Sequence, residues 1–150
     1  MTKTKLLIIG WREWVALPDL GIGKIKAKID TGARSSSLHA FDIEIVQTPG
    51  ELSQGKQRVR FKVHPLQRDT INTVSAEVDL LEYRPVRNSG GQTELRPVIL
   101  TDIELMGKRW LMELTLTNRD AMGFRMLLGR QALKRRFLID CRQSFLSDSQ

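Results

Sequence analysis

Apolar and polar residues alternate along much of the chain with the two-residue period of a β-strand. In the segment 25–29, Ile25, Ala27 and Ile29 would share one face, because successive side chains on a strand point to opposite sides. The same period recurs in 41–45, 58–63, 74–80 and 110–116. Each of these segments is therefore predicted to be a strand with one buried and one solvated face.

Clusters of turn-forming residues separate the predicted strands at 48–50, 54–56, 88–91 and 106–108. A single short segment, from about Arg130 to Arg136, has a helical pattern. Many short strands joined by turns predict an all-β fold, in the form of a closed or partly closed antiparallel barrel with one short C-terminal helix.

The chain has 150 residues, which is the size of one ordinary domain with one core. We predict a single domain over residues 1–143 and a polar C-terminal tail over residues 144–150 that frays. No apolar run approaches the ~20 residues that span a bilayer, so no membrane partner is expected. The first apolar run is short and is followed by Trp11-Arg12-Glu13 rather than a cleavage site, so we interpret residues 1–10 as a first strand.

Cys141 is the only cysteine, so no intrachain disulfide can form. A lone thiol and the missing leader pattern together predict a cytoplasmic location. The net charge of +7 would attract nucleic acid, acidic peptides or an anionic surface, although a basic protein without an acidic partner fits it equally well.

Two motifs carry candidate chemistry. Asp30-Thr31-Gly32 directly follows the strand predicted at 25–29, and alone it is more typical of an Asp-initiated turn. Met126-Leu127-Leu128-Gly129-Arg130 is an apolar strand that ends in glycine before the predicted helix, and alone it fits a plain buried strand. The two motifs in this order resemble the retropepsins, the retroviral-type aspartic peptidases.

The resemblance extends to a bacterial family of retropepsin-like endopeptidases, formerly labelled ATP-dependent zinc proteases. The segment 27–40 is the most similar, and 14–21, 85–91 and 118–130 also fit, so nearly the whole chain is covered. The resemblance implies a retropepsin-like (acid protease) closed barrel.

The resemblance also implies roles for individual residues. Asp30, Thr31 and Gly32 would be the catalytic loop, with Thr31 bonding across a dimer and Gly32 allowing close approach. Ala33 and Arg34 would contact the substrate. The residues that would pack behind the loop are Leu127, Leu128, Gly129 and Arg130.

Aspartic peptidases use two carboxylates that share one proton, one acting as base toward water and the other polarising the carbonyl. The chain contains one Asp-Thr-Gly, and no other Asp precedes Thr-Gly or Ser-Gly. Two copies of the chain must therefore each contribute Asp30, so a homodimer is required for this mechanism.

Retropepsins close a glycine-rich hairpin, the flap, over the substrate. The loop 48–56 lies nearer to Asp30 in sequence, but Asn88-Ser89-Gly90-Gly91 has the more retropepsin-like distance to Gly129, and its glycines suit a hinge. We favour Asn88, Ser89, Gly90 and Gly91 as the flap and as substrate-binding residues. An ordinary flexible loop is the alternative.

The sequence departs from viral retropepsins at two points. Arg34 stands where they usually carry an acidic residue, so Arg34 and Arg130 would repel each other unless an acid lies between them. The spacing from Asp30 to Gly129 is also longer, which indicates an insertion at about 47–75. His39 and His64 have no metal-binding motif, so neither a metal nor another cofactor is expected.

These observations predict a dimeric aspartic endopeptidase that acts on acidic peptides. Basic residues flank Asp30 and the favoured flap, namely Lys24, Lys26, Lys28, Arg34, Arg84, Arg87 and Arg96. Members of the resembled family are often associated with ATP-grasp ligases that append glutamates, so glutamate-tailed proteins, such as a ribosomal one, are candidate substrates.

Two alternatives remain open on sequence grounds. The first is a non-catalytic basic β-barrel that binds RNA or a ribosomal partner. Aromatic residues make up only 6% of the chain, and the three tryptophans lie in strand patterns suited to a core, so nucleic acid is not the expected partner. The second is a degenerate peptidase that dimerises without cutting.

Overall fold

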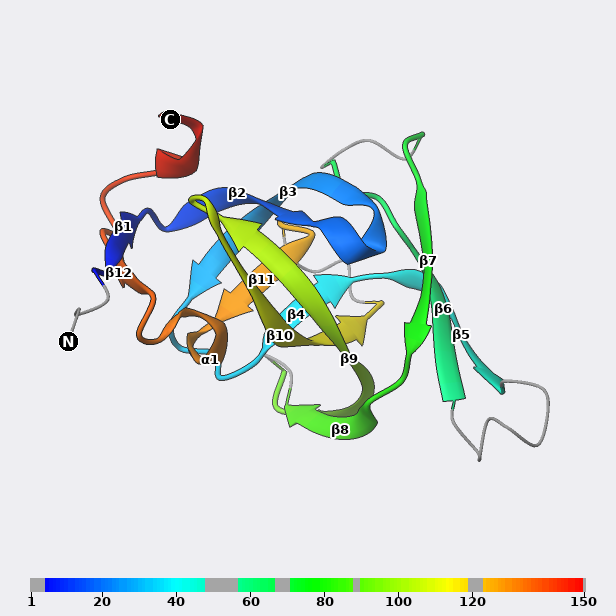
Figure 1. Ribbon diagram of the computed structural model, residues 1–150. Helices are drawn as coiled ribbons and strands as arrows, with labels where there is room; N and C mark the ends of the chain where they lie inside the picture. Colours follow the sequence, from blue (N-terminus) through cyan, green and yellow to red (C-terminus); the bar gives the residue numbers. More distant parts are fainter. Residues whose placement is uncertain (1–4, 48–56, 67–70, 88–89, 119–122, 150) are drawn as a thin grey trace.

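The computed structural model describes residues 5–47, 57–66, 71–87, 90–118 and 123–149 (Figure 1). Nearly all regular structure in these residues is β-strand. The strands are β1 (Leu7–Ile9), β2 (Arg12–Leu17), β3 (Ile22–Asp30), β4 (Ser36–His39), β5 (Phe41–Gln47), β6 (Gln57–Val63), β7 (Val74–Asp79), β8 (Glu82–Arg87), β9 (Thr93–Leu105), β10 (Lys108–Thr117), β11 (Met126–Gly129) and β12 (Phe137–Ile139). The helices are α1 (Arg130–Leu133) and two 3-10 turns, η1 (Pro18–Leu20) and η3 (Leu146–Ser149).

Seven strands form the main sheet in the order β10-β4-β11-β3-β2-β9-β8, and β10 also pairs with β9. This additional pairing closes six of the strands into a ring, with β8 attached to the outside of β9. Most neighbours are antiparallel, but β11 runs parallel to β3, and β10 runs parallel to β4. The prediction of an all-β, retropepsin-like fold with one short helix is confirmed, and its closure takes the form of this ring.

A second sheet of three antiparallel strands, β5-β6-β7, is inserted in the chain between β4 and β8 and stands beside the ring (Figure 1). It occupies the place of the expected insertion, and its strands extend from residue 41 to residue 79. Val59, Phe61 and Val63 on β6 are fully buried in the same core cluster as the ring strands. The second sheet is therefore packed against the ring rather than separate from it.

The core follows the two-residue period seen in the sequence. On β3, Ile25, Ala27 and Ile29 are buried, whereas Lys24 and Lys28 on the opposite face are exposed. The largest fully buried side chains come from every strand of the ring, and they include Leu17, Ile22, Ile25, Leu38, Ile99, Ile103, Leu114, Leu116, Met126 and Leu128. Among the described residues, no helix is long and apolar enough to cross a membrane.

The helix is shorter than the sequence predicted. It ends at Leu133, because Lys134 is extended and Arg135 takes a left-handed conformation with φ of 68°. The chain then turns into β12, which pairs in parallel with β1. Arg136 therefore lies outside the helix.

The expected fraying of the C-terminal tail is wrong for residues 144–147. Glu13 is fully buried on β2, and its carboxylate accepts hydrogen bonds from the backbone N–H groups of Gly10, Leu146 and Ser147 and from the Ser147 hydroxyl, at 2.7–2.9 Å. The ring of Phe145 stacks on Trp14 with a centroid distance of 5.7 Å. A buried charge requires such hydrogen bonds, so the tail is fixed by the need to satisfy Glu13.

Candidate active site

Asp30 is the last residue of β3, and the tight turn that follows it is closed by its own side chain. The backbone N–H of Gly32 donates to Asp30 Oδ1 at 3.0 Å, and the N–H of Ala33 donates to the Asp30 carbonyl at 3.2 Å. Asp30 is half-buried, whereas Thr31 and Gly32 are exposed. The turn therefore presents a carboxylate at the surface of the protein.

β11 lies between the two strands that flank this turn. Gly129 is the register partner of Asp30 in the parallel β3 pairing, and Leu127 is opposite Ser37 of β4 in the antiparallel pairing. The loop from β3 to β4 therefore wraps around the end of β11. Period-2 patterning alone does not show this juxtaposition, because it marks the buried face of a strand but not its neighbour.

Hydrogen bonds attach the loop to the start of α1. The N–H of Arg130 donates to the Ala33 carbonyl at 2.9 Å, and the N–H of Gln131 donates to the Arg34 carbonyl at 3.1 Å. The Gly129 N–H donates to Ser36 Oγ at 3.1 Å. Three successive amides of the β11–α1 junction are thus satisfied by the loop, which holds the Asp30 turn in a defined position.

Gly129 has no room for a side chain. A Cβ atom built on it would lie 2.6 Å from the Ser35 carbonyl oxygen, and that neighbour is backbone. Glycine is therefore required here for close packing, not for an unusual backbone conformation.

Arg130 stabilises the loop from its exposed side. Its guanidinium donates to the carbonyl oxygens of Thr31 and Gly32 at 3.4 and 3.3 Å. No acidic side chain of the described residues pairs with Arg130 or Arg34, so none there offsets the repulsion predicted between the two arginines. The two arginines have different surroundings, because Arg34 lines a pocket to which Arg130 does not contribute.

The favoured flap lies at the turn between β8 and β9. These strands pair antiparallel up to Arg87 and Thr93, and Gly91 in the connection takes a left-handed φ of 82°. Gly90 and Gly91 are both exposed. Asn88 and Ser89 lie outside the described residues, as does the competing loop 48–56.

Some of the basic residues expected around the site are already paired with carboxylates of the same chain, and others are exposed. Arg96 is buried and pairs with Glu94 at 3.2 Å. Arg84 pairs with Glu113 at 2.8 Å and also with Glu82, and these hydrogen bonds raise the pKa of its guanidinium. Arg34 is exposed. The sequence showed the charges but not that two of them are neutralised within the chain.

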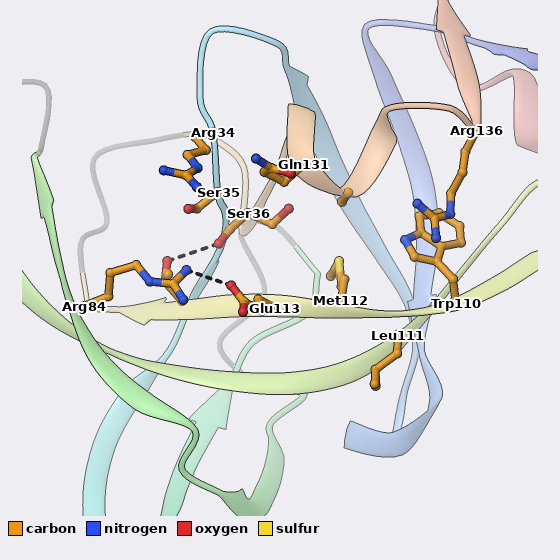
Figure 2. A pocket seen from close by; sticks show the side chains of 12 residues that line it. Arg34, Ser35, Ser36, Arg84, Trp110, Leu111, Met112, Glu113, Gln131 and Arg136 are labelled. Atoms are coloured by element: carbon orange, nitrogen blue, oxygen red, sulfur yellow. Dashed lines mark hydrogen bonds and ion pairs between the residues drawn. The ribbon is translucent and has the colours of Figure 1, made fainter.

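A pocket of about 600 Å³ opens beside the Asp30 loop, between residues 34–36, α1 and β10 (Figure 2). Its lining includes Arg136 and Trp110, neither of which the sequence marked as functional. The Arg136 guanidinium lies over the Trp110 ring, 5.0 Å from the ring centroid. The sequence pattern placed Arg136 at the end of the predicted helix and Trp110 in a strand. Neither pattern marked these residues as lining a pocket.

Metal ligands do not gather in the part of the chain that the structure describes: no group of three or more His, Cys, Asp or Glu side chains could hold an ion there. His39 ends β4, and His64 packs its ring against Phe41 with a centroid distance of 4.5 Å.

Comparison with known families gives a match over most of the chain. Residues 8–150 match the family model described as "Retropepsin-like aspartic endopeptidase RimB".

Curated relatives carry a different name. The chain is 48% identical over 133 residues to a probable alpha-L-glutamate ligase of Desulfotalea psychrophila, and 48% identical over 137 residues to one of Parasynechococcus marenigrum. These matches cover 89% and 91% of the chain but 28% of either relative. The chain thus spans less than a third of the length of the curated relatives it matches.

A solved structure has a similar fold. The crystal structure of a Legionella pneumophila protein of unknown function superposes with a TM-score of 0.74 at 28% sequence identity. The match covers 95% of this chain and 99% of that protein.

Proposed function

The chain belongs to the RimB-like family of retropepsin-like aspartic endopeptidases, and on this basis we propose that it hydrolyses peptide bonds with the Asp30 carboxylates of two copies. The observation that carries the proposal is the surface turn of Asp30, Thr31 and Gly32, which β11 and Arg130 hold in place. The two sequence motifs and the exposed position of the turn both support the choice of Asp30 for this role.

In the proposed mechanism, one Asp30 is ionised and the other is protonated. The ionised carboxylate removes a proton from water, the resulting hydroxide attacks the peptide carbonyl carbon, and the protonated carboxyl donates a hydrogen bond to the carbonyl oxygen. Collapse of the tetrahedral intermediate breaks the C–N bond, and a carboxyl proton passes to the leaving amine. The products are a carboxylic acid and an amine, so atoms and charge balance with water as the only co-reactant.

The proposed mechanism needs a homodimer, because each chain supplies one Asp-Thr-Gly. Thr31 and Gly32 are the exposed residues of the turn, so they are the ones available to a second copy. In this proposal Thr31 bonds across the two-fold axis, and Gly32 allows the two loops to approach closely. Ala33 and the hairpin around Gly90 and Gly91 would contact the substrate.

We propose that the substrate is an acidic peptide, such as a glutamate tail or a protein that carries one. The curated relatives are named probable alpha-L-glutamate ligases, and ligation of glutamate yields an acidic peptide. A chain with a net charge of +7 attracts such a product. The class of reaction that supplies the substrate would then be glutamate ligation, which this chain would reverse by hydrolysis.

The test is hydrolysis of a synthetic peptide with a C-terminal tail of glutamates, followed by mass spectrometry. We expect the wild-type protein to shorten the tail and Asp30→Asn to abolish cleavage, because an amide cannot act as the base. Asp42→Asn is the matched control, since Asp42 is exposed on β5 and asparagine tolerates its positive φ of 51°. Cleavage that persists in Asp30→Asn would contradict the mechanism.

The RNA-binding alternative has weaker support. Each tryptophan packs against another aromatic ring of the chain: Trp11 against Phe124, Trp14 against Phe145, and Trp110 against Phe137. Arginine or lysine groups of the chain also lie over all three indoles. Their faces are therefore already engaged, whereas base stacking requires an open ring face.

A further inference from the structure

The pocket beside the Asp30 loop has one wall made by the loop itself. Arg34, Ser35 and Ser36 form this wall, Gln131 and Ala132 of α1 form the next, and residues 110–113 and Thr115 of β10 form the floor (Figure 2). Its volume of about 600 Å³ lies within the ~300–1,000 Å³ typical of ligand sites. The pocket is large enough for a side chain of a bound peptide.

The side chains that line this pocket keep a net positive charge when the ion pair between two of them is set aside. Arg34, Arg84, Arg136 and Glu113 are its ionised lining residues. Arg84 and Glu113 neutralise each other at 2.8 Å, as the dashed line in Figure 2 shows. Arg34 and Arg136 remain, and neither is paired with a carboxylate within the residues that the structure describes.

The two remaining arginines are held in place. The carbonyl of Arg34 accepts from the N–H of Gln131 at 3.1 Å, which fixes its backbone against α1. The guanidinium of Arg136 lies over the Trp110 ring at 5.0 Å. Cation–π contact uses the face of a guanidinium and leaves its N–H edge for a planar acceptor such as a carboxylate.

Trp110 contributes a further donor without an acceptor. Its indole Nε1 is buried and has no hydrogen-bond partner in the described part of the chain. A buried N–H without a partner costs free energy, so polar groups of this kind are normally satisfied. Arg34, Arg136 and Trp110 supply only donors, and a carboxylate supplies only acceptors.

The pocket lining begins four residues after the proposed catalytic carboxylate. Arg34 follows Asp30 by four residues, so their Cα atoms are at most ~14 Å apart. An extended peptide advances ~3.3 Å per residue. A peptide that extends from Asp30 toward Arg34 therefore spans this distance in about four residues.

We propose that this pocket is a subsite for a side-chain carboxylate of an acidic peptide substrate, with Arg34 and Arg136 as the binding residues and Trp110 as the residue that orients Arg136. The inference rests on the proposed peptidase function for the identity of the ligand, and it adds the residues that select acidic peptides.

Binding of tetra-L-glutamate to the Asp30→Asn protein, measured by calorimetry, tests the subsite without catalysis. Arg34→Gln and Arg136→Gln should each weaken binding about tenfold, the range of one charge-assisted hydrogen bond. Lys134→Gln is the matched control, because Lys134 is exposed next to α1, carries the same charge and does not line the pocket. It should change the affinity less than about twofold.

Equal weakening by all three substitutions would overturn the proposal, because the effect would then reflect net charge alone. Failure of tetra-L-glutamate to bind the Asp30→Asn protein would also overturn it. Arg136→Lys distinguishes loss of the binding charge from a folding defect. It keeps a cation near Trp110, so it should bind tetra-L-glutamate more tightly than Arg136→Gln does.

Kinetics on the glutamate-tailed peptide separate this proposal from the peptidase proposal. Arg34→Gln and Arg136→Gln should raise KM and leave kcat nearly unchanged, as expected when uniform binding is lost. Cleavage with unchanged KM in both variants would overturn the subsite and leave the peptidase proposal standing. Arginine-dependent binding without any cleavage by the wild-type protein would support the subsite and contradict the peptidase proposal.

Discussion

Gly129 lies directly beside Asp30 in the parallel pairing of β11 with β3, although 98 residues lie between them in the chain. The absence of a side chain at Gly129 lets the Ser35 carbonyl pack within 2.6 Å of where a Cβ would be. The conformation of the Asp30 turn thus depends on a glycine that contributes no chemical group of its own.

Gly129→Ala should displace the Asp30 loop. The added methyl group would collide with backbone, which cannot rotate away, so we expect a loss of about 1–3 kcal/mol in the free energy of unfolding. Peptide hydrolysis should fall as well. Urea unfolding and the cleavage assay are the measurements.

Gly23→Ala is the control for this substitution. Gly23 is an exposed residue of β3, and a Cβ added to it would have nothing within 4 Å. It should change the unfolding free energy by less than about 0.5 kcal/mol. Equal effects at the two glycines would show that the contact with Ser35 is unimportant.

Mixing wild-type and Asp30→Asn chains should reveal that two copies form one active site. In an equal mixture that has exchanged subunits, about one quarter of the dimers contain two wild-type chains, so activity should be about one quarter of that of the same total amount of wild-type protein. The assay is the glutamate-tail cleavage. A value of one half would mean that each chain acts alone.

Glu13→Gln should release the C-terminal segment from β2. The amide keeps one acceptor oxygen, but its NH₂ group cannot accept from the donors that now contact the second oxygen. We expect a loss of about 3 kcal/mol, since each unsatisfied buried donor costs ~1–3 kcal/mol. Chemical denaturation measures the loss, and faster digestion by carboxypeptidase reports release of residues 144–147.

The control for Glu13 is Glu44→Gln. Glu44 is exposed and lies 3.7 Å from Arg60, and surface pairs of this kind contribute at most about 1 kcal/mol. If Glu13→Gln costs no more than Glu44→Gln, the buried carboxylate does not hold the segment.

Asp140 should titrate at unusually low pH. Hydrogen bonds from the Arg142 guanidinium, the Gln143 amide and the Arg142 backbone N–H lower the pKa of its carboxyl group. Because the folded pKa lies below the unfolded value of about 3.9, the stabilisation is fully present above that pH and is lost as pH falls through the folded pKa.

Carboxyl-carbon NMR of Asp140 measures this directly. Arg142→Gln should move the titration of Asp140 upward, toward the ordinary range, whereas Lys134→Gln should leave it in place. An unchanged titration in Arg142→Gln would mean that Arg142 does not hold the carboxylate in solution.

Many strands of the ring and of the second sheet could be predicted from local pattern. The alternation in residues 25–29, 58–63 and 110–116 predicted the correct strands and the correct buried faces. A strand buried on one side has apolar residues at every second position, so its sequence shows which face is buried. The order and register of the strands could not be obtained in this way. They depend on non-local pairing, such as that of β11 with β3 and β4.

The residues of the candidate site also fall into two groups, those that the sequence predicted and those that it did not. Asp30 and Gly129 were both identified from motifs, and the resemblance to retropepsins brought them together. Arg136 and Trp110 carried no motif, because their shared pocket forms only when the segment that follows α1 lies beside β10. Glu13 did leave a signal that was missed: it occupies the same strand phase as Val15 and Leu17, where a carboxylate must be buried.

The parallel pairing of β3 with β11 also has a consequence for the order of folding. Residues 22–30 cannot complete their sheet until residues 126–129 have been synthesised, and a contact of such long sequence separation forms slowly. During translation, Asp30 therefore emerges from the ribosome long before the strand that supports its turn. In a nascent chain that stops short of residue 126, the Asp30 turn lacks the neighbouring strand and the amides that hold it in place.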